Sequence, residues 1–259
     1  MQNNNDFFVS IITPNYNGEK YLEETIVSVI SQTNKNFEFL IFDGNSNDKS
    51  HEIINKFKDK IDHLSIEKDI NHYHAVDKAI KICNGNIILW INSDDVLHKD
   101  AVSNIIKIFK ADESIEWISG KNGYIKNGKK IIGIPYIYPN IIIKKGLAHH
   151  NYWGFIQQET TVFKKKLFQK SGGFKKKYGN ASDYHLWINF SSFAKLKSYN
   201  IELGYFRTWA GQNSKVQEKN YFEDTGYKKN LISFRFLRIL FSILCLPYVY
   251  FKTKKLKKN

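Results

Sequence analysis

The sequence predicts an α/β fold built around a mostly parallel β-sheet. In the amino-terminal part of the chain, short β-branched segments alternate with segments of helical periodicity. One predicted strand, NIILWIN at residues 86–92, is apolar at successive positions, as expected for a strand with helices against both faces of its sheet. With 259 residues, 42% of them hydrophobic, the chain is long enough for one large domain or two small ones that share a core.

Strands and helices follow one another in a regular order. β-Branched and aromatic residues between polar loops indicate strands, and apolar residues spaced three and four apart indicate helices. The first strand ends at Pro14 and the second at Asp43. In chain order we expect a strand at 8–13, a helix at 19–32, a strand at 37–43, a helix at 45–57, a strand at 64–69, a helix at 72–83 and a strand at 86–92.

Beyond about residue 100 the pattern changes to added strands and helices. A helix is expected at 100–109, a strand at 115–120, and a hairpin at 124–134 whose turn is marked by Asn127-Gly128. No repeat or low-complexity linker separates the parts of the chain. We therefore predict a first half at 1–98, a second half at 99–215 that shares its core, and a helical, basic tail at 216–259.

The charge balance is strongly basic, with 39 Lys and Arg against 25 Asp and Glu and a formal net charge of +14. A surplus of this size favours polyanionic partners: nucleic acid, an anionic membrane face or phosphorylated small molecules. The two cysteines, Cys83 and Cys245, lie far apart and form neither a CxxC metal motif nor a disulfide framework. The segment MQNNNDFF lacks the features of a signal peptide, so we expect a cytoplasmic protein.

Three polar clusters follow the predicted strands: TPNYN, DGNSND and NSDD. In doubly wound sheets, ligands bind in the crevice beyond the carboxyl ends of the strands, where these clusters fall. In the last cluster, Asp94 and Asp95 are adjacent, and like charges this close raise each other's pKa unless a cation compensates. A hard divalent ion, Mg²⁺ or Mn²⁺, would do so. The alternative is that one of the two aspartates caps the following helix.

Several blocks in order resemble the inverting family 2 glycosyltransferases of the GT-A fold, which build bacterial surface polysaccharides. Residues 10–50 resemble the first nucleotide-binding block of that family, NSDD resembles its DXD-type motif, and residues 157–188 resemble its acceptor-side block. The resemblance covers roughly residues 8–214, and an ordered set of motifs is far more specific than any single one.

The resemblance implies a set of donor-binding residues. Pro14 and Tyr16 would lie against the nucleotide base, Asp43 would accept a hydrogen bond from a base N–H such as that of uracil, and Asp94 would approach the ribose or sugar. Asp95 would hold Mn²⁺ or Mg²⁺ against the diphosphate. The predicted nucleotide-binding residues are Thr13, Pro14, Tyr16, Asp43 and Asp94.

Asp183 is the predicted general base, because the resemblance assigns to this position the proton of the acceptor hydroxyl. It would stand near the start of a helix whose Leu186, Trp187 and Phe190 face the core. The alternative is an aspartate favoured only by the helix dipole. Further donor or acceptor contacts are expected from His74, Lys78, Gln158, Trp187, Arg207 and Gln212.

This chain departs from the pattern of its relatives at two places. His74, Asp77 and Ala79 stand where relatives usually have an acidic residue followed by Asn and Gly, which leaves the preference for base and sugar open. Ser182 precedes the predicted base where many relatives carry a carboxylate, so no paired-acid mechanism is expected.

The tail has an uncharged run from Ile239 to Phe251, interrupted by Pro247 and followed by a lysine cluster. This run is shorter than the roughly 20 residues that a membrane-spanning helix needs. It fits an interfacial segment held by anionic lipid, with a final helix packed on the domain as the alternative. A membrane role would suit a polyprenyl-diphosphate-linked acceptor.

The predicted function is transfer of a hexosyl or N-acetylhexosaminyl group from a nucleotide-diphosphate donor, with UDP-sugars favoured, to a hydroxyl of a glycan, with inversion. The product would be O-antigen, capsule or another surface polysaccharide, made at the cytoplasmic face of the inner membrane. Two alternatives stay open. A basic nucleic-acid binder would need a recognition motif that the sequence lacks, and a nucleotidyltransferase would need a glycine-rich phosphate loop after the first strand.

Overall fold

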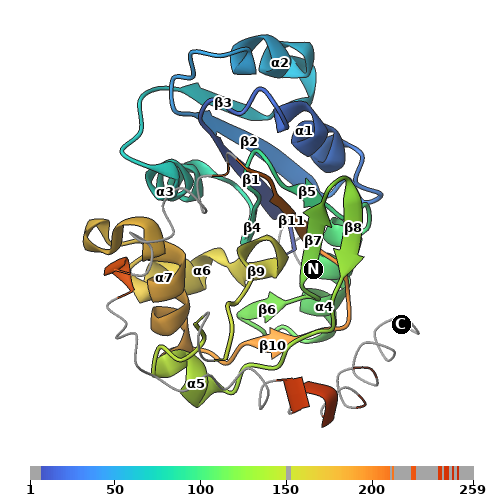
Figure 1. Ribbon diagram of the computed structural model, residues 1–259, viewed down its shortest axis with the longest axis vertical. Coiled ribbons are helices and arrows are strands. Elements are labelled where there is room, and N and C mark those ends of the chain that lie inside the picture. Colours follow the sequence, from blue (N-terminus) through green and yellow to red (C-terminus); the bar gives the residue numbers. More distant parts are fainter. Residues whose placement is uncertain are drawn as a thin grey trace, which may run out of the picture.

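The computed structural model describes residues 7–149, 153–210, 212, 223–225, 239–240, 242–244, 247 and 250. One sheet within these residues forms the centre of the molecule (Figure 1). Its strands are β1 (Val9–Asn15), β2 (Phe37–Asp43), β3 (His63–Ile66), β4 (Ile87–Trp90), β6 (Trp117–Ser119), β9 (Thr161–Lys164) and β10 (Lys197–Ser198). They lie in the order β10-β6-β9-β4-β1-β2-β3.

Most pairs in this sheet are parallel. β1 pairs in parallel with β2 and β4, and β2 with β3, whereas β9 runs antiparallel between β4 and β6. The predicted α/β fold with a mostly parallel sheet is confirmed. Because β6, β9 and β10 come from beyond residue 98, both predicted halves of the chain contribute strands to the same sheet; the division at 98 and 215 stays a prediction.

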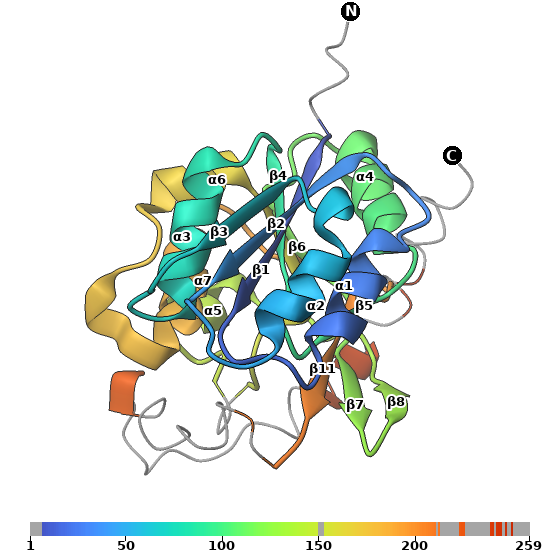
Figure 2. The same ribbon diagram turned by 90° about the horizontal axis from the view of Figure 1, so that it is seen from above.

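Helices cover both faces of the central sheet (Figure 2). They are α1 (Leu22–Ile30), α2 (Ser50–Lys56), α3 (His72–Ile82), α4 (Ala101–Ala111), α5 (Asn140–Lys144), α6 (Lys165–Ser171) and α7 (Ser182–Ser191), with short 3₁₀ turns at Lys58–Lys60, Gln158–Thr160 and Lys176–Ala181. Along β1, Val9 and Ile11 pack into the core that includes α1, α2 and α4, while Ile12 packs into the core that includes α3, α6 and α7. The alternation of side chains along one strand thus feeds two apolar cores.

A second sheet stands beside the first. Its strands are β5 (Val96–Leu97), β7 (Gly123–Lys126), β8 (Lys129–Ile132) and β11 (Gly204–Thr208), in the order β5-β11-β7-β8. The predicted hairpin turn is confirmed: Asn127 and Gly128 join β7 to β8 with φ values of 50° and 72°. Two positive φ values in succession are the geometry for which Asn-Gly is preferred.

Two local predictions need correction. The strand expected at 64–69 is shorter and begins one residue earlier, as β3 at His63–Ile66. The helix expected at 45–57 begins later, as α2 at Ser50–Lys56, and Asp48 before it accepts a hydrogen bond from the backbone N of Ser50. No helix within the described part of the chain is long and apolar enough to cross a bilayer. Cys245 and the final lysine cluster lie outside the described residues.

Candidate active site

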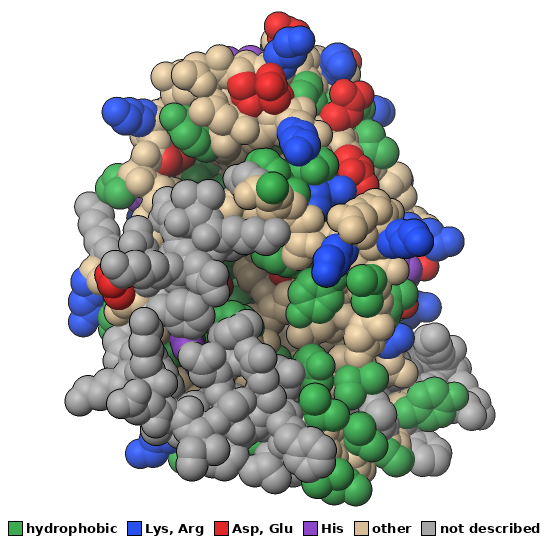
Figure 3. All heavy atoms as spheres, viewed as in Figure 1, with side chains coloured by type: hydrophobic (Ala, Val, Ile, Leu, Met, Phe, Trp, Pro, Cys, Tyr) green, Lys and Arg blue, Asp and Glu red, His purple; other side chains and the backbone are tan. Residues whose placement is uncertain are grey.

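The polar clusters predicted to line the crevice lie together at the carboxyl edge of the central sheet. Asn15 at the end of β1 is in register with Asp43 at the end of β2, and β1 also pairs with β4, after which Asp94 and Asp95 follow. Figure 3 shows the molecule hollowed near the centre of this view. Polar groups from separate parts of the sequence thus meet at one edge of the sheet.

Asp43 is fully buried and already held by the protein. Its Oδ2 accepts hydrogen bonds from Asn15 Nδ2 (2.6 Å) and Ser46 Oγ (2.7 Å), and its Oδ1 accepts one from the backbone N of Ser46 (2.7 Å) and lies 3.0 Å from His51 Nε2. A carboxylate has about four acceptor positions, so these four groups occupy them. The predicted hydrogen bond to a nucleotide base stays a prediction, and it requires one of these partners to give way.

The other residues predicted to bind the nucleotide differ in their exposure to solvent. Tyr16, directly after β1, is 66% exposed, so its ring is free to lie against a planar ligand. Thr13 and Pro14 are buried within β1. The Oγ1 of Thr13 finds no hydrogen-bond partner among the described residues.

The two adjacent aspartates differ sharply. Asp95 is fully buried, and its Oδ1 accepts a hydrogen bond from the backbone N of Arg207 (2.8 Å). Burial, together with the nearby charges of Glu159 and Asp94, raises the pKa of Asp95 well above its usual value. Burial also raises the pKa of Glu159, to about 7. Two carboxyl groups thus share a site closed to solvent, which leaves Asp95 no exposed oxygen to offer to an ion.

Asp94, in the same loop, is half-buried. Its Oδ2 accepts a hydrogen bond from Trp209 Nε1 (3.0 Å), and burial raises the pKa of its carboxyl group. For a metal ligand, the structure favours Asp94 over the predicted Asp95, because of these two adjacent carboxylates only that of Asp94 is partly exposed.

A divalent ion suits Asp94 by its chemistry. No group of three or more His, Cys, Asp and Glu side chains in the described part of the chain could hold a metal by itself. Mg²⁺ commonly binds through one or two carboxylates and completes its shell with water and substrate phosphates. A single accessible carboxylate fits an ion that arrives with a diphosphate.

Arg207 braces the loop that carries the two aspartates. It is 7% exposed; its Nε donates to the backbone O of Asp94 (2.7 Å), and its Nη2 bonds to Glu24. The guanidinium also lies over the ring of Tyr21, 4.3 Å from the centroid. The predicted contact between Arg207 and the donor stays a prediction, while its visible contacts hold the loop.

Asp183 stands in the first turn of α7, as predicted, and is half-buried. Its Oδ1 accepts a hydrogen bond from the backbone N of Tyr184 (2.7 Å), and the hydroxyl of Tyr73 also bonds to its carboxylate. Burial raises the pKa of Asp183 to about 6. The single O–H of Tyr73 is shared between this carboxylate and the backbone O of Asn180 (2.9 Å), which ties α3 to the 3₁₀ turn before α7.

His74 and Lys78 share one ion-pair cluster beyond the end of β3. Asp69 Oδ1 lies 2.9 Å from His74 Nδ1 and 2.6 Å from Lys78 Nζ, which also lies 2.7 Å from Glu67. The backbone N of Glu67 bonds to the O of Asp43, so this cluster borders the predicted base site. Contacts of His74 and Lys78 with a ligand remain predictions.

Three other predicted contact residues are buried. Trp187 is 3% exposed and stacks between Trp90 and Trp117 in the core, so its predicted contact with substrate does not fit the structure; the apolar face of α7 determines its position. Gln158 is 7% exposed and supports the strand before the aspartates by bonding to Asn92 and to the O of Trp90. Gln212 is 3% exposed.

The sequence did not single out several residues that shape the site. Tyr73 positions Asp183, Trp209 donates to Asp94, Glu159 faces Asp95, and Glu24 pairs with Arg207. Trp209 lies two residues after Arg207, which is a predicted contact residue, so alternation along a strand could have indicated it. No local pattern distinguishes the other three.

Known proteins are similar to this chain over most of its length. It is 29% identical over 248 residues to the UDP-Glc:alpha-D-GlcNAc-diphosphoundecaprenol beta-1,3-glucosyltransferase WfaP of Escherichia coli, with 93% of this chain and 91% of WfaP covered. It is 28% identical over 225 residues to the chondroitin synthase of Pasteurella multocida strain Pm70, with 83% of this chain and 22% of that protein covered. The chain thus spans only about a fifth of the length of that synthase and of the P. multocida hyaluronan synthase.

Solved structures share the fold. TarS 1–349 of S. aureus in complex with UDP-GlcNAc aligns with a TM-score of 0.68 and 18% identity, over 84% of this chain and 64% of that one. The mannosyltransferase PcManGT from Pyrobaculum calidifontis, in complex with GDP-Man and Mn²⁺, aligns with a TM-score of 0.61 and 15% identity, over 96% and 73%. The predicted GT-A fold is confirmed.

The segment that carries Asp43, Asp94 and Asp183 also carries the family signature. Residues 10–185, more than half of the chain, match the sequence description "Glycosyl transferase family 2". This chain belongs to glycosyl transferase family 2.

Proposed function

We propose that this protein is an inverting glycosyltransferase that moves a sugar from a nucleotide-diphosphate donor, with UDP-sugars favoured, to a hydroxyl group of a glycan. One observation carries the proposal: two half-buried carboxylates with raised pKa values, Asp94 and Asp183, stand at the carboxyl edge of a GT-A sheet. Perturbed carboxylates in such a crevice favour a reactive site over a purely structural one.

Asp183 would act as the general base. A carboxylate whose pKa is about 6 is largely ionised at neutral pH, yet it binds a proton more readily than an exposed aspartate. The Tyr73 hydroxyl and the backbone N of Tyr184 fix its orientation. One base that removes the proton of the acceptor hydroxyl is sufficient for a single displacement, and a single displacement inverts the anomeric centre.

Asp94 would hold Mn²⁺ or Mg²⁺. When bound, such an ion stabilises the charge that develops on the departing diphosphate. Trp209 orients the carboxylate through Oδ2, and Arg207 holds the peptide of Asp94 in place. The buried pair Asp95 and Glu159 would support this loop from beneath.

The nucleoside would lie along the ends of β1 and β2. Tyr16 offers an exposed ring to the base, and Asp43 stands at the end of the neighbouring strand. The uridine preference draws support from WfaP, whose name gives UDP-Glc as donor, and from TarS, whose complex holds UDP-GlcNAc. The hexosyl or N-acetylhexosaminyl choice follows the same two proteins.

The acceptor would be a glycan linked to polyprenyl diphosphate in the synthesis of O-antigen, capsule or another bacterial surface polysaccharide. WfaP supports this choice because it aligns over nearly its whole length and its name gives a diphosphoundecaprenol-linked acceptor. An acceptor of this kind would place the enzyme at the cytoplasmic face of the inner membrane as a peripheral protein.

A donor screen tests the proposal. The full chain is incubated with UDP-, GDP- and dTDP-sugars and a short polyprenyl-diphosphate-linked glycan, with Mn²⁺, with Mg²⁺ or with EDTA, and nucleotide release is measured. We expect metal-dependent release of UDP and a product of inverted configuration. Release of pyrophosphate from a nucleoside triphosphate would favour a nucleotidyltransferase instead, and binding of oligonucleotides in preference to nucleotide sugars would favour a nucleic-acid binder.

A further inference from the structure

Two long stretches of the chain contain no aspartate or glutamate. Residues 117–158 contain six lysines, and residues 225–259 contain seven lysines and two arginines, without one carboxylate side chain in either stretch. Charge runs on an ordinary solvated surface mix both signs. The sequence thus contains two strongly cationic stretches without acidic side chains of their own.

The first stretch contains the β7–β8 hairpin. On its outward face, side chains of neighbouring strands line up in rows across the sheet. Strand pairing places residues of β11, β7 and β8 side by side on that face. One row is apolar and consists of Phe206, Tyr124 and Ile131. The next row, at the tip of the hairpin, consists of Thr208, Lys126 and Lys129.

Only one face of the hairpin is packed. On the inner face, Ile125 is 3% exposed and contacts Val96 and Tyr205. On the outer face, Tyr124 is 37% exposed and Ile131 is 50% exposed. The hairpin is thus anchored through one side and presents apolar side chains from the other.

Among the described C-terminal residues, large apolar side chains are exposed and a polar side chain is buried, the reverse of the usual arrangement. The exposed side chains are Ile239 (40%), Leu240 (44%), Ile243 (50%) and Leu244 (70%). Ser242, a polar residue, is fully buried and accepts a hydrogen bond from the backbone N of Ile137 (3.4 Å). A helical segment that turns its serine to the protein and its large apolar side chains outward fits a nonpolar environment outside the molecule.

Hydrophobic side chains gather on the lower right of the face in Figure 3, beside the central hollow. β11 connects this surface to the candidate active site, because side chains alternate along it: Phe206 faces outward, while Arg207 turns inward to the aspartate loop. Trp209, immediately after the strand, donates to Asp94. The apolar surface at Phe206 and Trp209, which donates to the carboxylate of Asp94, are therefore only three residues apart in the chain.

We propose that this face docks on a bilayer of anionic phospholipid. The Phe206–Tyr124–Ile131 row and the outward apolar residues of the C-terminal segment would enter the interfacial layer, and Lys126 and Lys129 would contact lipid phosphates. Charge selects this occupant over a second copy of the chain, because self-association would bring the lysines of two such hairpins together. The inference rests on the proposed function in one respect only: docking would bring the candidate active site to a lipid-linked acceptor.

Vesicle sedimentation tests the inference with the full chain and vesicles of equimolar phosphatidylcholine and phosphatidylglycerol. The variant Ile131→Glu with Leu244→Glu replaces two exposed side chains, and we expect its vesicle affinity to fall about 10- to 100-fold. Replacing Lys126 and Lys129 by Gln should lower the affinity about fivefold for each lysine. Ile82→Glu is the matched control, since Ile82 is 51% exposed on α3, and it should bind as the unaltered protein does.

Full vesicle binding by the Ile131→Glu, Leu244→Glu variant would overturn the inference. A dimer in solution that dissociates on the same substitutions and ignores vesicles would identify this face as an interface between copies instead. Release of UDP in the presence of a water-soluble acceptor should be unchanged in these variants. A protein that binds vesicles but turns over no donor would contradict the proposed function and leave the docking surface intact.

Discussion

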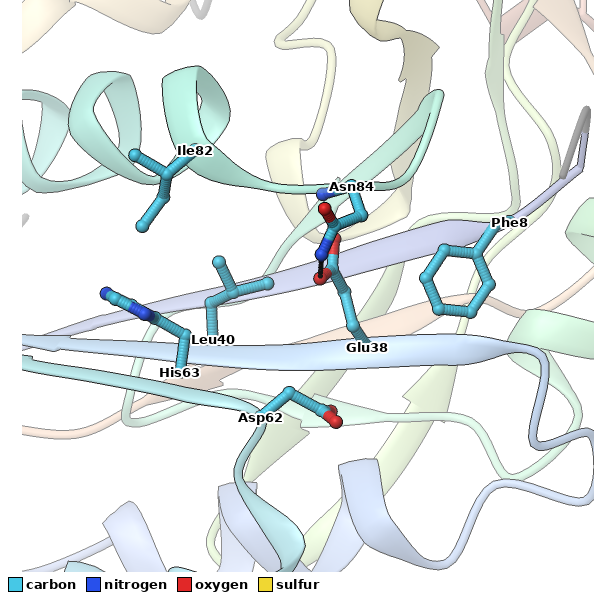
Figure 4. Close-up of a pocket in the computed structure, with 7 residues that line it drawn as sticks. All are labelled: Phe8, Glu38, Leu40, Asp62, His63, Ile82 and Asn84. Carbon is cyan, nitrogen blue, oxygen red and sulfur yellow. Dashed lines mark hydrogen bonds between the residues drawn. The ribbon is translucent and has the colours of Figure 1, made fainter.

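Both edges of the central sheet hold buried carboxylates. Glu38 at the amino edge, however, has more hydrogen-bond partners than Asp94 or Asp183 at the carboxyl edge. At the amino edge, Glu38 of β2 accepts hydrogen bonds from Ser10 Oγ, from the backbone N and side chain of Asn84, and from the backbone N of Gly85 (3.0 Å). Figure 4 shows Glu38 and Asn84 hydrogen-bonded to each other (2.8 Å) in the wall of a cavity of about 360 Å³. Every polar partner that Glu38 needs comes from the chain itself.

At the carboxyl edge, Asp94 and Asp183 have fewer partners, and burial raises the pKa of both. A buried carboxylate with few hydrogen-bond donors and no cation beside it is stabilised most when a cation or a proton binds to it. A cavity alone therefore does not locate function. Glu38, beside the amino-edge cavity, finds its hydrogen-bond partners within the chain, whereas Asp94 and Asp183 at the carboxyl edge have few partners.

The largest expected effect is on transfer by Asp183→Asn. Removing the base should lower kcat about 10²–10⁴-fold while donor binding, measured by titration calorimetry with UDP and Mn²⁺, stays within a few-fold of the original. Asp59→Asn is the matched control, because Asp59 is an exposed aspartate in the 3₁₀ turn after α2. Near-normal transfer by Asp183→Asn would place the base elsewhere.

A second test separates the two adjacent aspartates. Asp94→Asn should lower metal-dependent turnover about 10²–10³-fold, because it removes the accessible ligand of an ion that contributes several kcal/mol to the reaction. Asp95→Asn should keep the metal requirement, since an amide oxygen can still accept from the backbone N of Arg207. If Asp95→Asn raises the Mn²⁺ concentration needed for half-maximal rate and Asp94→Asn does not, the assignment is reversed.

The rate should also depend on pH through Asp183. A base works only when ionised, and its pKa is about 6. Therefore kcat/KM should fall about tenfold per pH unit below 6 and level off above about 7. A pH series of UDP release with saturating Mn²⁺ measures this limb, and the residual activity of Asp183→Asn should lack it. A flat profile down to pH 5 would contradict the assignment of the base.

Stability should respond in opposite senses at the two edges. Because the pKa of Asp183 is raised from 3.8 to about 6 in the folded state, ionising this carboxyl group disfavours folding as pH rises through that window. Asp183→Asn should then raise the free energy of unfolding at pH 8 by about 1–3 kcal/mol, and by much less at pH 4. Urea unfolding at the two pH values measures the difference; equal effects would show that burial does not act on this group.

Glu38→Gln should have the smallest effect on activity. An amide nitrogen facing the donors of Asn84 and Gly85 loses a hydrogen bond, so the free energy of unfolding should drop by about 1–3 kcal/mol. Transfer per folded molecule should stay unchanged, as measured by UDP release after correction for the folded fraction. A strong loss of kcat with the fold intact would mean that the amino edge takes part in the reaction.

Local sequence patterns predicted the strands and helices of the first half because each carries its own periodicity. β9 could not be placed in this way: its antiparallel position between β4 and β6 depends on pairing between residues far apart in the chain. Nor could the sequence show which aspartate faces the crevice. Asp94 and Asp95 are neighbours, and their environments diverge through Arg207, 112 residues from Asp95, and through Glu159.

Trp187 illustrates the limit of a resemblance. The periodicity of its helix placed it toward the core, whereas the family comparison suggested a contact with substrate, and packing against Trp90 and Trp117 decides for the core. The place of Asp183, the proposed general base, in the first turn of its helix was accessible to sequence reasoning, whereas its role came from the family resemblance. Tyr73, which orients that base, comes from a helix more than a hundred residues earlier, and no local pattern links the two.

The most direct measurement is a crystal structure of the protein with UDP and Mn²⁺, with the ion located by its anomalous scattering. The account predicts one Mn²⁺ bound to the carboxylate of Asp94 and to the diphosphate, with Asp95 still bonded to the backbone N of Arg207 and out of contact with the ion. Manganese bound to Asp95, or UDP bound in the cavity beside Glu38, would contradict it.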